Sequence, residues 1–577
     1  MTDKLARKIV EVSMSRAKAD LCLKNANVVD VYNKTTFLTD VYIVDGYFAA
    51  FKGAIEANET IDVKGKYLIP GFIDAHCHIE SSHLSPSAFS DAVVPCGTTT
   101  VIADPHEICN VAGLDALSYM LKASENIPLS VFYMFPSCVP ATPFENAGAV
   151  LTSEDILKVI DNERILGLGE MMNYPGVVYG DDEVYKKLGV AYDKKKNIDG
   201  HSPAIKDNIL DAYTACRITT DHECDTAEEL VERVRRGMYV MLRQGTACKN
   251  VKNLVKGVNE QNSSRVLFCT DDRQPQTIKE YGHINHGVNI AIEEGLSPLT
   301  AISAATLNAA TCYGLKDRGA IAPGLRADCF ISSSLDSIKA EEVFILGNIV
   351  ASNGVIKEKA PHTVPEKVSG MMDVKDFTLD KLKLKLDKDE VNIIDIIPGG
   401  VVTGRSTEKV KRDKDGYYVQ DSNKDILKLA VVERHHATGN VGLALIRGYG
   451  MKDGAVATSI AHDSHNIIVI GSNDEDMFIA VNELIKLGGG ITMVKDKKVL
   501  MSHRLEIGGL MTDDSQDEVC KTLDEMHKVS DKVLHVNKDI DPFMTLCFMA
   551  LPVIPELKLT DTGLFDVTAF KHISVEA

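Results

Sequence analysis

Two histidines one residue apart, His76 and His78, end an apolar run in the segment PGFIDAHCHIESSH. If that run is a β-strand, alternate side chains point to opposite faces, so both imidazoles lie on one face at the strand's end. Two imidazoles on one face can bind one metal ion. The alternative is a pair of ordinary polar residues at the edge of a sheet. The spacer Cys77 points to the other face and is interpreted as a packing residue.

Other metal-ligating residue types follow later apolar runs in the same way. They are Glu170 after RILGLG, His201 after NIDG, His222 and Glu223 after CRITTD, and Asp271 after RVLFC. Taken alone, each has an ordinary explanation, such as a helix cap or a turn. Their joint occurrence, each at the end of a separate apolar run, predicts a centre that holds two cations. Imidazoles and carboxylates suit borderline divalent ions such as Mn, Fe or Zn.

The region that must position these residues, 70–318, alternates apolar runs with helical patterns. This rhythm is typical of a (β/α)8 barrel, in which the carboxyl ends of all strands meet at one mouth. A doubly wound open sheet has the same rhythm and is the structural alternative. No GxGxxG motif follows an early strand, which disfavours a dinucleotide-binding sheet.

The predicted fold class is α/β, with the TIM-like barrel inserted in a small composite β-sandwich domain and followed by a C-terminal α+β domain. Short strands with Asp and Gly turns occur on both sides of the barrel region. The predicted parts are 1–69 (an N-terminal helix and the first part of the composite β domain), 70–318 (the barrel), 319–356 (the second β part), 357–370 (a linker) and 371–577 (the C-terminal domain).

The composition excludes several classes of function. The chain has 577 residues and a net charge of −19, which argues against nucleic acid or an anionic membrane as a partner. Its thirteen cysteines form no CxxC pair, which favours reduced thiols and a cytoplasmic location. The N-terminus lacks the apolar segment of a secretory signal, and no apolar run is long enough to span a membrane.

The motifs also resemble a known family. PGFIDAHCH after a small β module, followed by Glu, His, His and Asp in that order, resembles the amidohydrolase superfamily. The segments DAHCHIESSH, TTTVIADPHEICNV, GLGEMMNYPGV, DGHSP, TTDHE and FCTDDR are more narrowly similar to the bacterial adenine deaminase family. The resemblance covers most of residues 20–350 and returns in GYGMKDGAVATSIAHDSHNIIVIG. His83, where an apolar residue is expected, is a small departure.

The resemblance implies a binuclear centre of two divalent transition metal ions, with Mn or Fe preferred over Zn. Its implied ligands are His76, His78 and Asp271 for one ion, His201 and His222 for the other, and Glu170 as a bridge between them. No carbamoylated lysine is needed, because the strand that supplies the bridge ends in glutamate.

The implied reaction is the hydrolytic deamination of adenine to hypoxanthine and ammonia, as in purine salvage, by a metal-bridging hydroxide that attacks C6. Such a hydroxide is available because bound metal lowers the pKa of water from about 15.7 to about 7. Asp271 is expected to take the proton and pass it to the leaving ammonia. Glu223 has two alternative roles, protonation of a ring nitrogen or support of the ligand His222.

Three residues are expected to bind the substrate: Glu80, Ser82 and His106. Glu80, Ser81 and Ser82 follow the two histidines on the first loop, and a helix N-cap is the alternative role for either serine. His106 lies in DPHE after the second strand, where it either faces the ring or orders the loop.

Two alternative functions stay open. One is hydrolysis of a cyclic amide or another heterocycle, as in dihydroorotase-like or hydantoinase-like relatives, and the other is a non-catalytic scaffold on the same fold. A homodimer is expected because large composite amidohydrolases are often multimeric. The cluster of His462, Asp463 and His465 has three alternative interpretations: a second metal site, a segment that closes over the barrel mouth, or a hydrogen-bonded turn.

Overall fold

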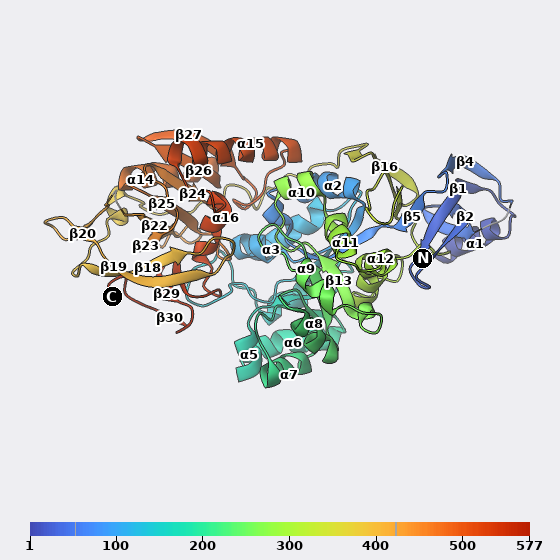
Figure 1. Cartoon of the computed structure of the whole chain (residues 1–577), viewed down its shortest axis with the longest axis horizontal. Coiled ribbons are helices and arrows are strands. Elements are labelled where there is room, and N and C mark those ends of the chain that lie inside the picture. The colour runs from blue at the N-terminus through green and yellow to red at the C-terminus, as the bar shows by residue number, and fades with distance from the viewer. Residues whose placement is uncertain (52–53, 422–423) are drawn as a thin grey trace.

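The computed structural model describes residues 1–51, 54–421 and 424–577. Three parts follow one another along its longest axis, with the barrel between an N-terminal sheet and a C-terminal domain (Figure 1). Helix α1 (Asp3–Ser13) packs beside the N-terminal sheet and begins at Thr2, whose hydroxyl accepts the N–H of Leu5. Within the described ranges, no helix combines the length and apolarity that crossing a membrane requires.

Eight parallel strands form the barrel. Their bounds are β6 (Phe72–Cys77), β7 (Thr98–Ala103), β8 (Ser130–Phe135), β9 (Ile165–Met171), β10 (Asn197–Gly200), β11 (Thr220–Asp221), β12 (Tyr239–Arg243) and β13 (Val266–Cys269). The Asp271 N–H donates to the His76 carbonyl at 3.0 Å, which joins the last strand to the first. The Thr219 N–H donates to the Ile198 carbonyl at 3.0 Å and joins β10 to β11. The sheet therefore closes, and the predicted barrel is confirmed.

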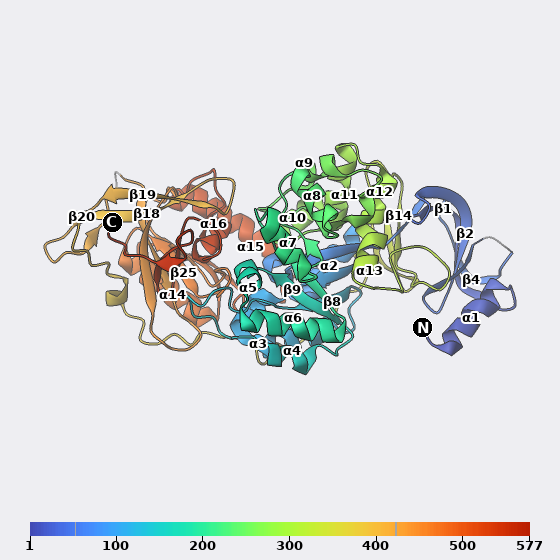
Figure 2. The ribbon, with the colours of Figure 1, turned by 90° about the horizontal axis from the view of Figure 1, so that it is seen from below.

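Helices surround this sheet, and Figure 2 shows them on both sides of β8 and β9. They are α2 (Pro86–Val93), α3 (His106–Ala123), α4 (Ser153–Val159), α5 (Tyr174–Tyr179), α6 (Asp182–Lys194), α7 (Asp207–Ala215), α8 (Ala227–Arg235), α9 (Val251–Leu254), α10 (Pro275–Tyr281), α11 (Ile284–Glu293), α12 (Pro298–Ser303) and α13 (Ala309–Cys312). The start of α8 shows how local sequence can fix where a helix begins. At α8, Thr226 Oγ1 accepts the Glu229 N–H at 3.2 Å, and the Glu229 carboxylate accepts the Thr226 N–H at 3.3 Å.

One nine-stranded sheet contains segments from both sides of the barrel. Its strands are β1 (Ala19–Asp30), β2 (Thr35–Val44), β3 (Tyr47–Phe51), β4 (Ala57–Asp62), β5 (Tyr67–Pro70), β14 (Cys329–Ser332), β15 (Glu342–Ile345), β16 (Asn348–Ser352) and β17 (Val355–Ile356). Strand β5 pairs antiparallel with β14. Phe48 and Phe344, one from each segment, are buried in the same apolar cluster. This pairing is what a composite β domain requires, and its boundaries, 1–69 and 319–356, stay a prediction.

The C-terminal domain is built on an eight-stranded sheet. Its strands are β18 (Glu390–Ile396), β19 (Thr403–Lys409), β22 (Ile426–Val432), β23 (Val441–Arg447), β24 (Ala455–Thr458), β25 (Ile467–Gly471), β26 (Gly490–Lys495) and β27 (Lys498–Arg504). Smaller strands are β20 (Lys411–Arg412), β21 (Tyr418–Val419), β28 (Leu557–Thr560), β29 (Gly563–Asp566) and β30 (Lys571–His572), and the helices are α14 (Asp474–Leu487), α15 (Gln516–Val529) and α16 (Pro542–Cys547).

Helix α14 covers one face of this sheet, where Met477 and Leu484 pack against Val469. Residues 357–370, the proposed linker, are all described and contain no helix or strand. Backbone bonding then attaches the domain to the barrel, because the Thr512 N–H donates to the His83 carbonyl and the Ser85 N–H to the Thr512 carbonyl, both at 2.9 Å. The C-terminal domain is thereby held against the first loop of the barrel mouth.

Candidate active site

The barrel strands bring the six predicted metal ligands to one mouth. His76 lies in β6 and His78 directly after it, Glu170 lies in β9, and His201, His222 and Asp271 follow β10, β11 and β13. All except His201 are buried, and His201 is partly exposed. Groups drawn from these six, such as His76, His78 and Glu170, have ligand atoms within 4.8 Å of one another. Residues far apart in the chain thus converge around one space.

Glu170 lies between the two sets of histidines. Its Oε2 is 2.9 Å from His201 Nδ1 and 3.1 Å from His222 Nε2, and these two nitrogens are 3.3 Å apart. Its Oε1 is 3.6 Å from His78 Nε2. One carboxylate therefore contacts both halves of the centre, which is the arrangement that a bridging ligand requires.

The protonation of His78 tests whether cations fit here. Its Nδ1 is 2.9 Å from the carbonyl oxygen of Asp104, which can only accept, so Nδ1 carries a proton. In the neutral ring Nε2 then carries only a lone pair, and this nitrogen lies 3.1 Å from Asp271 Oδ1. His76 Nε2 is buried and forms no hydrogen bond with any residue that the structure describes. Lone pairs and carboxylates that face one another fit a shared divalent cation.

Burial opposes ionisation of both carboxylates at this centre, but their neighbours dominate. Hydrogen bonds from His201 and His222 hold the pKa of Glu170 well below its usual range. For Asp271, the positive charge of Arg243 is the largest effect that opposes burial, and it holds the pKa of Asp271 far below its usual value. Both side chains are therefore anionic, the form in which carboxylates bind metals.

Arg243, at the end of β12, was not predicted from the sequence as a site residue. Its Nη1 donates to Asp271 Oδ2 at 2.7 Å and also to Glu223 Oε1, and its Nη2 donates to Glu223 Oε2 at 3.2 Å. The only available signal was its position, since a charged residue ends an otherwise apolar strand at the barrel mouth.

Glu223 is thereby held in an ion pair. Burial would raise its pKa, but Arg243 and His201 lower it far below the usual value. Its Oε1 also lies 3.3 Å from His222 Nε2. A strongly ionised carboxylate is a poor proton donor, so these contacts favour the supporting role over protonation of the substrate.

The three residues predicted to bind substrate lie in different surroundings. Glu80 is buried; its Oε1 accepts the Ile108 N–H at 3.2 Å, and its Oε2 has no hydrogen-bond partner in the described part of the chain. Ser82 donates to the Ile79 carbonyl at 2.6 Å within a single 3-10 turn. His106 lies 3.3 Å from Glu170 Oε1 and 3.6 Å from Asp104 Oδ1. These contacts favour a structural role for Ser82.

Comparison with known proteins covers both the barrel and the C-terminal domain. Residues 67–356 match the amidohydrolase family model, and residues 400–571 match that of the adenine deaminase C-terminal domain. A protein named adenine deaminase 2 from Desulfotalea psychrophila is 49% identical over 578 residues, 100% of both chains. The chain belongs to the adenine deaminase family of amidohydrolases. Adenine deaminases from Nitratidesulfovibrio vulgaris (46% identical; 99% of each chain) and Halalkalibacterium halodurans (47%; 99% of this chain and 98% of the relative) also match.

As in amidohydrolases generally, membership of the adenine deaminase family implies the use of divalent metal.

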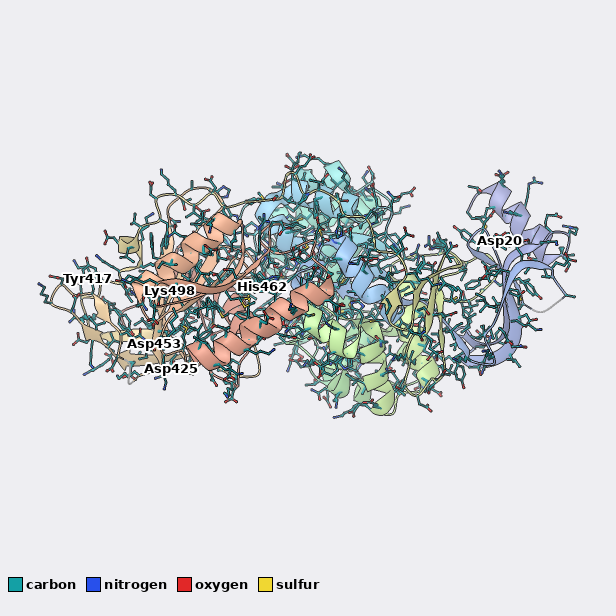
Figure 3. The ribbon with its side chains drawn as sticks, turned by 90° about the horizontal axis from the view of Figure 1, so that it is seen from above. Asp20, Tyr417, Asp425, Asp453, His462 and Lys498 are labelled. Carbon is teal, nitrogen blue, oxygen red and sulfur yellow. The ribbon has the colours of Figure 1, made fainter. Side chains whose placement is uncertain are left out.

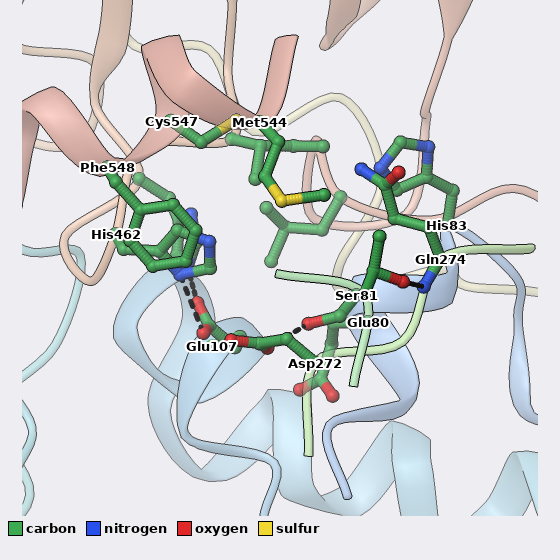
Figure 4. A pocket seen from close by; sticks show the side chains of 14 residues that line it. Glu80, Ser81, His83, Glu107, Asp272, Gln274, His462, Met544, Cys547 and Phe548 are labelled. Atoms are coloured by element: carbon green, nitrogen blue, oxygen red, sulfur yellow. Dashed lines mark hydrogen bonds and ion pairs between the residues drawn. The ribbon is translucent and has the colours of Figure 1, made fainter. Parts of the chain in front are cut away.

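Beside the centre, a cavity separates the barrel mouth from the C-terminal domain (Figure 4). Its barrel side is lined by Glu80, Ser81, His83, Glu107, Thr246, Asp272 and Gln274. Its other side is lined by Ile460, His462, His465, Leu510, Met544, Cys547 and Phe548. The cavity therefore has a polar floor and a largely apolar roof.

Asp272 lies between this cavity and the predicted metal ligands. Its carboxylate accepts the Ser81 hydroxyl at 2.5 Å. The same carboxylate has an oxygen within 4.8 Å of ligand atoms of His78 and Asp271. A small molecule in the cavity thus lies next to His78 and Asp271, two of the six predicted metal ligands. Ser81 lines the cavity, whereas Ser82 is not among its lining residues.

Proposed function

We propose that this chain hydrolyses adenine to hypoxanthine and ammonia at the barrel mouth. The observation that carries the proposal is the convergence of six proposed ligand side chains, Glu170 among them, beside a cavity roofed by the C-terminal domain. Family membership over the whole chain supports the same reaction. The implied enzyme is an adenine aminohydrolase.

The proposed ligands are those expected from the sequence. His76, His78 and Asp271 would hold one cation, His201 and His222 the other, and Glu170 would contact both. Divalent cations bound there would supply hydroxide at neutral pH, because they lower the pKa of water from 15.7 to about 7. Mn or Fe is proposed ahead of Zn, on the resemblance alone.

Asp271 is proposed to move the proton. Arg243 binds its Oδ2, so Oδ1 is the oxygen that faces His78 and the centre. An anionic Asp271 accepts the proton of the attacking water and returns it to the departing amine, which leaves as ammonia. The carbon–nitrogen bond at C6 breaks and a carbon–oxygen bond takes its place, so the products are hypoxanthine and ammonia.

Glu80 is proposed to contact the purine ring in preference to Glu223. Its Oε2 is buried without a partner among the residues that the structure describes, and the side chain lines the cavity. Burial raises the pKa of Glu80 to about 7, whereas the pKa of Glu223 is strongly lowered. A carboxyl group of raised pKa can donate a hydrogen bond to a ring nitrogen, as the reaction requires when C6 becomes tetrahedral.

The deciding experiment uses metal-stripped enzyme reconstituted separately with Mn, Fe and Zn. Each form is given adenine and, separately, dihydroorotate and a hydantoin, and ammonia release and ring opening are measured. We expect ammonia and hypoxanthine from adenine. Ring opening of a cyclic amide without ammonia from adenine would replace the proposal with the cyclic-amide alternative. Less than about half an equivalent of metal under replete conditions would favour the scaffold, because one binuclear centre binds two ions.

The remaining expectations concern the surroundings of the enzyme. All thirteen cysteines are unpaired, which supports the proposal of a cytoplasmic location. Two expectations stay predictions from composition and resemblance: that the enzyme has no nucleic-acid or membrane partner, and that it is a homodimer. Gel filtration with light scattering tests the dimer.

A further inference from the structure

Part of the roof of the cavity is formed by two rings from separate segments of the C-terminal domain. His462 lies in the loop between β24 and β25, and Phe548 follows α16. Their ring centroids are 4.5 Å apart with an interplanar angle of 18°. The backbone N–H of His462 donates to the backbone carbonyl of Cys547 at 3.1 Å. Figure 3 places His462 where the C-terminal domain meets the barrel, whereas Tyr417 lies at the far end of that domain. The stack therefore faces the barrel mouth.

Glu107, in the first turn of α3, fixes the orientation of the His462 ring from the barrel side. Its Oε1 lies 2.8 Å from His462 Nδ1, and its Oε2 accepts from His465 Nε2 (Figure 4). The Ala461 N–H donates to His465 Nδ1 at 3.2 Å, so we infer that the proton of that ring is on Nε2. A protonated Nε2 donates to Glu107 and is not free for a metal. This cluster is thus a hydrogen-bonded contact between domains.

Burial lowers the pKa of His462, but the charge of Glu107 outweighs it and raises the pKa to about 9, so both ring nitrogens carry a proton. With Nδ1–H bonded to Glu107, Nε2–H is the donor of His462 that can contact a molecule in the cavity. The lining around it is arranged for a flat heterocycle, because Phe548, Met544 and Leu510 offer apolar contact while Glu80 and Gln274 offer polar groups. The cavity adjoins the metal centre at Asp272, so a ring placed there has one edge at the metals and another toward the C-terminal domain.

We propose that His462 is a substrate-binding residue supplied by the C-terminal domain, whose Nε2 hydrogen-bonds a ring nitrogen of the purine while Phe548 fixes the imidazole plane. The assignment rests on the proposed adenine deaminase function. It gives the C-terminal domain a direct part in substrate selection, and it makes Glu107 a positioning residue that acts through His462.

The test compares two substitutions of His462 in the full-length, metal-loaded enzyme. In His462→Asn the amide can replace Nδ1 and keep the bond to Glu107, but nothing replaces Nε2. In His462→Gln the amide can reach the place of Nε2. We expect KM for adenine to rise about tenfold in His462→Asn and less in His462→Gln, the scale of one lost hydrogen bond. Metal content should stay that of the wild type.

Deaza analogues identify the contacted atom and keep the proposal falsifiable if His462→Asn folds poorly. Inhibition by 1-, 3- and 7-deazaadenine is measured in wild type and in both variants, with His435→Gln as a control histidine of the same domain outside the cavity. One analogue should bind the wild type about tenfold more weakly than the others, and this difference should vanish in His462→Asn and persist in His462→Gln. An unchanged KM in His462→Asn, or a difference that persists in His462→Asn or vanishes in His462→Gln, would overturn the proposal. Failure of the proposed function would instead appear in the wild type, as no ammonia from adenine.

Discussion

Arg243 Nη1 lies 2.7 Å from Asp271 Oδ2, and the same guanidinium binds both oxygens of Glu223. Asp271 therefore has its two oxygens in different surroundings, since Oδ1 lies 3.1 Å from His78 Nε2. The ion pair orients Asp271, and Glu223 in turn contacts His222. Through these two carboxylates, Arg243 is coupled to both halves of the proposed metal centre without being one of its proposed ligands.

Arg243→Lys should lower kcat by at least about tenfold while the enzyme keeps its metal. A lysine carries the charge but cannot bind two carboxylates with the planar fork of arginine, and charge-assisted hydrogen bonds contribute about 1.5–3 kcal/mol each. Ammonia-release kinetics and metal analysis measure the two quantities. Arg236→Lys, at a surface pair with Asp211, is the matched control. An unchanged kcat would show that the ion pair has no part in orienting Asp271.

Asp271→Asn should reduce the rate by at least about two orders of magnitude, the scale of a lost general acid–base group. The amide preserves the shape of the side chain but cannot accept and return a proton in the same way. Asp211→Asn, in the exposed pair with Arg236, controls for the loss of one negative charge. Single-turnover rates with adenine measure the step, and retained activity would reject the assignment of Asp271.

Glu170→Ala should lose bound metal and activity together. Its carboxylate contacts His201, His222 and His78, so its removal takes a ligand from both halves of the centre. Metal content after desalting and ammonia release are compared with those of Glu341→Gln, at a pair with Lys66 distant from the barrel mouth. Two retained equivalents of metal in Glu170→Ala would contradict the bridging role.

Adjacent serines should respond differently to alanine. Ser82→Ala removes a hydrogen bond of about 1 kcal/mol to the Ile79 carbonyl, so it should lower the thermal midpoint and leave the kinetics unchanged. Ser81→Ala removes the donor to Asp272 beside the cavity and should change KM or kcat at an unchanged midpoint. The opposite pattern would restore Ser82 as the substrate-binding serine and leave Ser81 with the capping role.

Lys558 should make the stability of the fold depend on pH. Its side chain is fully buried, its Nζ donates to the carbonyls of Val401 (2.8 Å) and Phe548 (2.9 Å), and burial lowers its pKa from 10.5 to about 7. Between these two pKa values Lys558 is protonated in the unfolded chain and neutral in the folded chain. The free energy of unfolding therefore rises with pH from about 7 to about 10.5, and below about 7 it gains nothing from this group.

Thermal midpoints of the wild type and Lys558→Met at pH 7, 8 and 9 measure this effect, because methionine has a similar length and no charge. The wild type should gain stability relative to the variant as the pH rises, by at most about 1.4 kcal/mol per pH unit. Parallel curves would mean that Lys558 stays protonated in the folded protein.

The barrel was predictable because its strands are apolar runs that end in polar residues. His76, Glu170 and Asp271 each follow this local pattern, and the closed parallel sheet then brings the ends of its strands together. Arg243 has the same position at the end of a strand, but its role depends on Glu223 and Asp271, which approach it only after the strands pair. No local pattern encodes that contact.

The roof of the cavity was harder to predict for a related reason. Phe548 lies in the apolar segment LCFMALP, where an aromatic residue is equally typical of an ordinary core. Its neighbour His462 belongs to a cluster for which three explanations were open. The contact with Glu107, across 355 positions of the chain, is what distinguishes them, and only the packing of the C-terminal domain on the barrel creates it.

The two sides of the cavity come from different domains of the chain. The barrel supplies the groups suited to water activation, which any hydrolysis at this mouth would need, and a different domain covers the cavity beside them. Substitutions in the covering loops can therefore redirect such an enzyme toward another nitrogen heterocycle while its hydrolytic machinery is inherited intact. Divergence of specificity within this architecture should accordingly be recorded first in the residues around Ile460, Met544 and Phe548.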